Sequence, residues 1–174
     1  ADGKLIITVS NSRDSESVVW TGANGSIWDL MESENFASSD KKFVSGDNVT
    51  FDDTAVKSDV KINEDLAPGN IVFDNNSKVY TLSGNGAIEG TGSVTLKGKS
   101  AVNIKNTNRY TGGTYIDGGY LRPATLANKD GLEYGSLGAA DNTITMSNLG
   151  KLWVNASMTS SHPIVLGENG GQIE

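Results

Sequence analysis

Residues 106–121 read NTNRYTGGTYIDGGYL, and this stretch decides the fold. Its two glycine pairs, at 112–113 and 118–119, enclose a short alternating run that contains Ile116, and Leu121 follows the second pair. Glycine tolerates positive φ angles and close backbone approach, which a sharp corner between strands requires. Alternation predicts that Ile116 and Leu121 point into a core while their neighbours point outward. The stretch therefore predicts two very short strands with tight corners.

The same pattern continues from Val60 to the end of the chain. Short apolar segments such as 71–73, 94–96 and 144–146 recur roughly every ten residues, separated by Gly, Asn, Ser and Asp. This spacing leaves no room for intervening helices and argues against a doubly wound α/β fold. A β-solenoid tolerates such short strands, whereas an antiparallel β-sandwich shows longer strands and hairpin signals. We therefore predict an all-β parallel β-helix (β-solenoid), with the antiparallel β-sandwich as the alternative.

The chain divides into three regions. Residues 1–17 hold an apolar run at 4–9, predicted to be a strand, followed by a polar linker. Residues 18–59 mix strand and turn patterns and are interpreted as the entry region that caps the solenoid. Residues 60–174 form its coils, and their final glycine-rich corner enters a strand that stops at once. Because a solenoid normally ends in a polar cap, we expect truncation at the C-terminus and a larger parent polypeptide.

Two segments depart from the strand pattern. Residues 27–34 fit either a strand or a short helix with a serine cap. Residues 123–140 lack the alternation and are predicted to protrude from a corner as a loop or helical turn. Trp20 and Trp28 lie near the N-terminal end of the predicted solenoid, where we expect tryptophan side chains to plug the open coil.

The composition excludes several classes of chemistry. The 174 residues include 21 Gly, one His and no Cys, so disulfides, thiolate metal sites, cysteine nucleophiles and multi-histidine metal sites are ruled out. The net charge of −7 disfavours nucleic acid as a partner, because phosphate backbones would be repelled. No apolar stretch approaches the roughly 20 residues that span a bilayer, so we expect this segment not to be membrane-inserted.

Residues 106–121 closely resemble the N-x-Y-T-G-G-T-x-I-x-G-G-x-L pattern of autotransporter-associated β-strand repeats, which occur in large secreted or surface-exposed bacterial proteins. The resemblance covers about residues 18–174. Segments similar to those that flank the repeat in such proteins occur at 20–22, at 28, and at 46–53, 84–92, 136–138 and 163–173. The chain departs from the pattern in having one full copy, with 80–84 as a weak partner.

The resemblance implies a right-handed parallel β-helix of the passenger type, usually with three strands per coil, in the extracellular part of a bacterial protein. It implies no particular activity, because such repeats serve as stalks for very different effector regions. The residues of the motif itself have structural roles: its glycines form corners, and Asn106 and Asn108 can bind exposed turn amides with their side chains.

Candidate catalytic and metal-binding residues are few. His162 lies in a turn before a proline, without a strained nucleophile elbow nearby in the sequence, and is interpreted as an exposed turn histidine. A polysaccharide lyase or hydrolase would need facing carboxylates, or a carboxylate facing a base. Asp117 with Arg109 or Arg122 is the nearest approximation, although charge pairing between stacked coils is the favoured interpretation. We therefore predict no catalytic residues.

Acidic clusters raise the question of a cation. Asp47, the pair Asp52 and Asp53, and Asp74 could supply oxygen ligands to Ca²⁺, but the sequence has neither the EF-hand spacing nor the glycine-rich nonapeptide repeat. Turn formation is the favoured role, and a Ca²⁺ site near Asp52 and Asp53 stays a hypothesis. We predict no other cofactor.

Aromatic side chains supply the remaining candidate site. Flat aromatic faces suit pyranose rings, and we consider four residues for glycan stacking: Tyr110, Tyr115, Tyr120 and Trp153. Alternation with Ile116 and Leu121 predicts that Tyr115 and Tyr120 point outward.

These observations predict a non-catalytic stalk or surface-interaction module of an extracellular or surface-bound bacterial protein. Its partner would be a ligand or glycan on a host or neighbouring cell. A carbohydrate-binding or carbohydrate-processing accessory module is the alternative, and alignment of the outward aromatics along one face would favour it.

Overall fold

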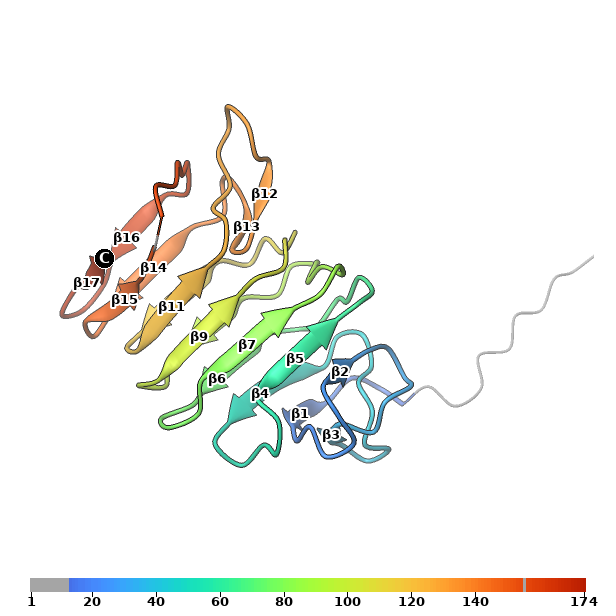
Figure 1. Ribbon diagram of the computed structural model, residues 1–174. Coiled ribbons are helices and arrows are strands. Elements are labelled where there is room, and N and C mark those ends of the chain that lie inside the picture. The colour runs from blue at the N-terminus through green and yellow to red at the C-terminus, as the bar shows by residue number, and fades with distance from the viewer. Residues whose placement is uncertain (1–12, 155) are drawn as a thin grey trace, which may run out of the picture.

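The computed structural model describes residues 13–154 and 156–174, which form a parallel β-solenoid of about six turns (Figure 1). The strand predicted at 4–9 lies outside the described residues. Two long sheets run along the solenoid. Sheet A contains, in spatial order, β16 (Ile164–Leu166), β14 (Ile144–Ser147), β10 (Thr114–Asp117), β8 (Val94–Leu96), β6 (Ile71–Asp74), β4 (Asn48–Asp52), β1 (Ser17–Trp20) and β3 (Phe36–Ala37). Sheet B contains β17 (Gly171–Ile173), β15 (Gly150–Leu152), β11 (Tyr120–Pro123), β9 (Ala101–Ile104), β7 (Tyr80–Ser83), β5 (Asp59–Ile62) and β2 (Ile27–Trp28).

Successive coils stack in parallel and in register. Val49 pairs with Ile71, Ile71 pairs with Val94, and Val94 pairs with Thr114, so one coil takes about 22 residues. Inward residues thereby lie above inward residues of the next coil, which keeps one core continuous. The predicted parallel β-helix is confirmed. The antiparallel sandwich is wrong, because antiparallel pairing among the described residues is confined to β1 with β3 and to a small hairpin.

The third side of the solenoid is built mostly from loops. Among the described residues, β-type pairing on this side is limited to one isolated bridge, between Leu66 and Ile88. The resemblance implies three strands per coil, and the third strand is therefore not formed in the described part of the chain. Side-chain amides replace the missing ladder. Asn108 accepts a hydrogen bond from the Ile88 N–H (2.9 Å) and donates one to the Ser136 carbonyl (2.8 Å). Asn108 is fully buried and Asn106 nearly so, and the hydrogen bonds of both side chains lie in the interior and not, as we expected, at exposed turns.

The N-terminal end is filled by aromatic side chains. Trp20 and Trp28 are fully buried, as predicted, and Trp28 packs edge-on against Phe43 with ring centroids 5.3 Å apart. The stack continues into the coils, where Phe51 and Phe73 lie parallel at 4.8 Å. These rings close the end of the core to water.

No helix forms at 27–34, nor elsewhere in the described residues. Strand β2 ends at Trp28, and Asp29 then accepts hydrogen bonds from the Ser33 N–H (2.7 Å) and hydroxyl (2.6 Å). Met31 has a φ of 63°, which interrupts any right-handed turn. No helix of the described part is long and apolar enough to cross a membrane.

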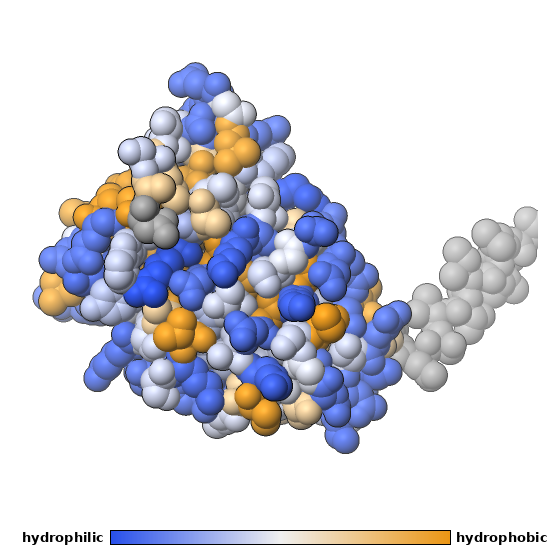
Figure 2. Space-filling model, in the orientation of Figure 1, coloured by the Kyte–Doolittle hydropathy of each residue, from blue (hydrophilic) through white to orange (hydrophobic). Residues whose placement is uncertain are grey.

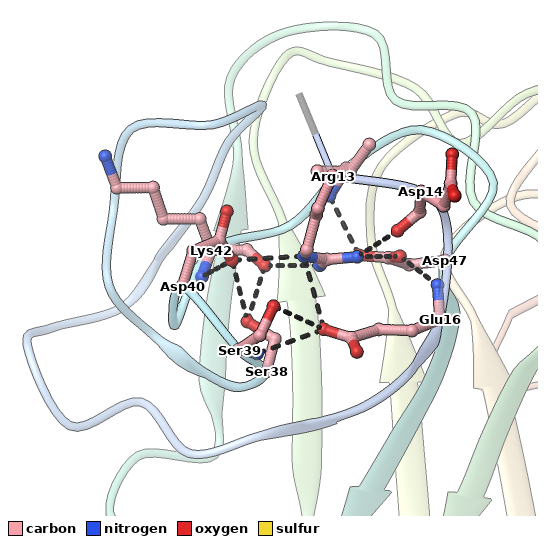
Figure 3. Close-up of polar contacts among 9 residues, drawn as sticks. Arg13, Asp14, Glu16, Ser38, Ser39, Asp40, Lys42 and Asp47 are labelled. Atoms are coloured by element: carbon pink, nitrogen blue, oxygen red, sulfur yellow. Dashed lines mark hydrogen bonds and ion pairs between the residues drawn. The ribbon is translucent and has the colours of Figure 1, made fainter. Parts of the chain in front are cut away.

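A polar cluster fastens residue 13 and its neighbours to the entry region (Figure 3). The Arg13 guanidinium donates to both carboxylate oxygens of Asp47, at 2.7 and 2.5 Å, and to Asp40 at 3.1 Å. Asp47 is fully buried and also accepts the N–H groups of Glu16 and Val44. Burial would raise the pKa of Asp47, but the hydrogen bonds from Arg13 and the two N–H groups outweigh it and hold that pKa below its ordinary value. Asp47 thus holds the segment around Arg13 against the entry region.

A loop protrudes from one corner, as predicted for residues 123–140. Thr114 pairs with Ile144, thirty residues later, and the extra length folds into the hairpin of β12 (Tyr134–Gly135) and β13 (Gly138–Ala139), which stands away from the sheets (Figure 1).

The C-terminal coil is much less covered than the N-terminal one. Hydrophobic side chains gather at this end in Figure 2. Leu166 in β16 is 61% exposed and Ile173 in β17 is 58% exposed, although the equivalent residues one coil earlier, Met146 and Leu152, are buried.

Candidate functional site

A groove lies on the outer face of sheet B, across strands β9, β11 and β15. Its volume is about 510 Å³. It is lined by Asn103, Lys105, Arg122, Pro123, Ala124 and Trp153. Cationic, aromatic and amide side chains therefore meet on one face of the solenoid.

Strand alternation and coil register explain how these side chains come together. Leu121 is buried, so its neighbours Tyr120 and Arg122 in β11 point outward. Leu121 pairs with Leu152, which brings Trp153 level with Arg122, and the Trp153 N–H donates to the Leu121 carbonyl at 2.9 Å. The site is thus built on regular, hydrogen-bonded backbone.

The Arg122 guanidinium lies against both aromatic rings. Its Cζ atom is 4.1 Å from the centroid of the Trp153 ring and 5.9 Å from that of Tyr120. The two rings are themselves 6.2 Å apart, at 57° to each other. Such cation–π contacts hold a flexible arginine in one orientation.

The lysines around the groove differ in their partners. Lys151 lies 5.2 Å from the Tyr120 centroid and forms an ion pair with Glu174 at 2.7 Å. The hydrogen bond to Glu174 raises the pKa of Lys151. Among the described residues, neither Lys105 nor Arg122 pairs with a carboxylate. The groove therefore presents positive charge without a neighbouring countercharge, on a chain whose net charge is −7.

The four aromatic residues proposed for glycan stacking separate in the structure. Tyr120 and Trp153 lie together beside the groove. Tyr115 points outward, as predicted, but from β10 in sheet A, and is 42% exposed. The prediction for Tyr110 is wrong: it is 1% exposed, and its hydroxyl forms a hydrogen bond with that of Thr114 inside the core, so its ring offers no face to a ligand.

The carboxylate and base combination considered for catalysis does not form. Arg109 pairs with Asp65 and Glu89, both from earlier coils, and the Asp117 carboxylate accepts a hydrogen bond from Asn148 at 2.6 Å. These contacts confirm that Arg109 takes part in charge pairing between stacked coils. Arg122 instead faces the groove described above.

His162 is buried and not exposed as predicted. It is 6% exposed, and its Nδ1 lies 2.8 Å from the Asn142 carbonyl oxygen. A carbonyl can only accept, so Nδ1 carries the proton and donates. Burial lowers the pKa of His162. Its Nε2 is buried without a hydrogen-bond partner among the described residues. The nearby Ser160 hydroxyl accepts a hydrogen bond from the His162 backbone N–H at 3.2 Å.

The acidic residues considered for Ca²⁺ bind turn backbone. Asp53 accepts hydrogen bonds from the N–H groups of Asn76, Ser77 and Lys78 in the next coil, which lower its pKa to about 2. Asp52 accepts from Thr54. Residues 13–154 and 156–174 contain no group of three or more His, Cys, Asp or Glu side chains arranged to hold a metal ion, so the Ca²⁺ hypothesis gains no support here.

No protein-family model, curated protein or solved structure matches the chain. The solenoid architecture therefore rests on the structure itself, and the resemblance of residues 106–121 to autotransporter-associated repeats serves as a basis for proposal alone. Sequence reasoning missed Asn103 and Lys105, and did not join Arg122 to the aromatics. Alternation with Leu121 could have placed Arg122 beside Tyr120, but linking them to Asn103 requires the coil register.

Proposed function

We propose that this chain is a non-catalytic segment of an extracellular bacterial β-helix protein, in which it acts as a rigid stalk or surface-interaction module. The observation that supports the proposal is that several ionisable side chains hold neighbouring coils or loops together. Arg13, Asp53, Arg109 and His162 each bind a neighbouring coil or loop. The likeness of residues 106–121 to autotransporter-associated repeats supports an extracellular setting, where a ligand or glycan on a host or neighbouring cell is the partner.

Rigidity can be tested with two dyes, because the chain has no cysteine of its own. Ala23→Cys and Asp141→Cys create attachment points at exposed positions in different coils. We expect a single narrow distribution of inter-dye distance in single-molecule energy transfer, since stacked coils move as one body. The same protein in denaturant is the control and should give a broad distribution. A broad distribution in native buffer would contradict the stalk proposal.

Absence of catalysis can be tested with a panel of acidic and neutral polysaccharides. We expect neither new reducing ends nor unsaturated products, because no carboxylate faces a base across the groove in the described residues. Product release by the unaltered chain that disappears in the Arg122→Gln variant would overturn this part of the proposal.

Carbohydrate binding is a second candidate function, and a specific observation favours it. Tyr120 and Trp153 lie side by side on the outer face of sheet B, which a stalk does not require. A glycan array probed with the labelled chain tests this candidate. Hits that the Trp153→Ala variant loses would support it, and an array without hits would count against it.

A further inference from the structure

We infer that the groove on sheet B binds the carboxylate of an acidic sugar, namely a uronic acid unit of a polysaccharide. This inference deepens the second proposed function, carbohydrate binding, and names the substrate class that the groove selects. It departs from simple stacking of neutral sugars on Tyr120 and Trp153.

The first argument is the orientation of Arg122. The Cζ atom of Arg122 lies 4.1 Å from the centroid of the Trp153 ring, which holds the guanidinium against the indole. The Nε atom of Arg122 is buried, and among the described residues no side-chain hydrogen bond or ion pair engages its terminal N–H groups. A guanidinium has five N–H donors in a planar fork that matches the two oxygens of a carboxylate. Arg122 is therefore held in place before any ligand arrives, with donating capacity unused.

The second argument is the local charge. Of the three arginines, Arg13 and Arg109 pair with carboxylates, whereas Arg122 pairs with none in the residues that the structure describes. Arg122 lines the groove together with Lys105, and neither has a carboxylate partner in the described part of the chain. On a chain of net charge −7, two uncompensated cations in one groove attract a small anionic group.

The third argument is the state of the aromatic faces. Arg122 covers one face of Trp153, and Lys151 and Arg122 both approach the Tyr120 ring. Because these cations already contact the aromatic faces, we expect charged side chains of the groove, and not the rings, to be the main groups that bind the ligand. Trp153 is still 38% exposed, and this surface can contact the sugar ring that carries the carboxylate.

Peptides and nucleic acids fit the groove less well. Strands β9 and β11 each pair on both sides, so the groove has no free strand edge to which an extended peptide could add. A polynucleotide would bring many phosphates against an acidic chain. A short uronide brings few charges, all within reach of the local cations.

The experiment compares two ligands with the same sugar backbone, one with free carboxylates and one with uncharged methyl esters. Trigalacturonate and its fully methyl-esterified form are titrated into the full chain, with binding followed by calorimetry and by backbone amide NMR. We expect trigalacturonate to bind at least about tenfold more tightly, the scale of one charge-assisted contact. We also expect its NMR shifts to centre on β9, β11 and the residues around Trp153.

Four variants locate the site. Arg122→Gln and Lys105→Gln should each weaken trigalacturonate binding about tenfold, and Lys105 is exposed, so its replacement should leave folding intact. Lys61→Gln removes an exposed charge from β5 on the same face, and Tyr115→Ala removes an outward aromatic from sheet A. These two matched controls should leave affinity unchanged.

Four outcomes would overturn the inference. The first two are equal binding of trigalacturonate and its ester, and no binding of either. The other two are a loss of affinity in the Lys61→Gln control as large as in Arg122→Gln, and binding of hexaglutamate as tight as that of trigalacturonate. Equal binding of ester and acid would leave carbohydrate binding itself standing. No binding of either would remove this site and leave the stalk proposal untouched, because that proposal rests on rigidity.

Discussion

Asparagine side chains take the place of backbone partners along the third side of the solenoid. Asn108 joins three coils, since it accepts from Ile88, accepts from Asn106 at 2.7 Å and donates to Ser136. The Asn142 side chain joins two coils, since it accepts from the Gly113 N–H of the coil before and donates to the Leu137 carbonyl of its own coil. A buried amide that meets backbone groups above and below it stabilises the corner in which it lies.

Replacement of Asn108 should therefore be costly. In Asn108→Ala the Ile88 N–H and the Ser136 carbonyl lose their partner in the core, and we expect a loss of about 2–3 kcal/mol in the free energy of unfolding. Urea denaturation followed by circular dichroism measures it. Asn85→Ala is the matched control, because Asn85 is exposed, and it should change stability little. A similar loss in both variants would refute the role assigned to Asn108.

His162 should make stability depend on pH. Its pKa is lowered in the folded chain by burial, so it is neutral in the fold and protonates more readily when unfolded. The contribution of neutral His162 to the free energy of unfolding is therefore complete above the pKa of histidine in the unfolded chain, about 6.5. The free energy of unfolding falls as the pH is lowered through that value. Urea midpoints measured from about pH 7.5 to pH 5.5 should decrease.

The control for this prediction is His162→Asn, which retains an N–H donor near the position of Nδ1. The chain has no other histidine, and carboxylates titrate mainly at lower pH. The urea midpoint of the variant should therefore be nearly flat over the same range. A slope equal to that of the unaltered chain would assign the effect to other groups.

At the scale of elements, glycines set how closely successive corners stack. A Cβ atom on Gly92 would lie 1.7 Å from the Gly69 carbonyl oxygen of the coil before it, and one on Gly112 would lie 2.4 Å from the Gly92 carbonyl oxygen. Both contacts are with backbone, which cannot move aside without separating the coils. These glycines are required for close approach.

We expect Gly92→Ala to destabilise the chain by about 3 kcal/mol, because the coils at this corner must separate. Thermal and urea unfolding measure the change. Gly131→Ala is the control, since a Cβ there would meet only the Asn128 side chain, at 3.2 Å or more, and the loop can adjust. Equal stability of the Gly92→Ala variant and the unaltered chain would show that the corner is looser than the structure indicates.

Sequence patterns predicted the strands of the two sheets well and the third side poorly. The apolar segments at 71–73, 94–96 and 144–146 became β6, β8 and β14, because alternation reports directly which residues face the core. Along the third side, a polar Asn108 is as buried as the hydrophobic residues. No local sequence pattern predicts the burial of Asn108, because its hydrogen-bond partners belong to the coils before and after it.

At the scale of the whole molecule, the two ends of the solenoid differ in how well their hydrophobic side chains are shielded from water. The N-terminal end is filled by rings and fastened by Arg13, whereas β16 and β17 have one neighbouring strand each and expose Leu166 and Ile173. In a solenoid each coil is stabilised by its neighbours, so a coil with one neighbour opens more readily.

Native-state hydrogen exchange should therefore show a gradient. We expect the slowest amide exchange in β6 to β9, where coils have neighbours on both sides, and the fastest sheet exchange in β16 and β17. The Arg13→Gln variant, which releases the contacts with Asp47, should accelerate exchange in β1 and β4 while that of β14 stays as it was. Amides of β16 and β17 as protected as those of β6 would contradict this description.

The sequence by itself determined that this chain is all-β, that its strands are short, and which residues of each strand face inward. Those properties depend on local alternation and on the conformational freedom of glycine, which residues carry wherever they lie. Only the tertiary structure decided that Tyr110 and His162 are buried, that Asn108 replaces a strand ladder, and that Arg122 meets Trp153 beside Lys105. These outcomes depend on register between coils about 22 residues apart, where contacts distant in sequence determine what is buried and what is accessible.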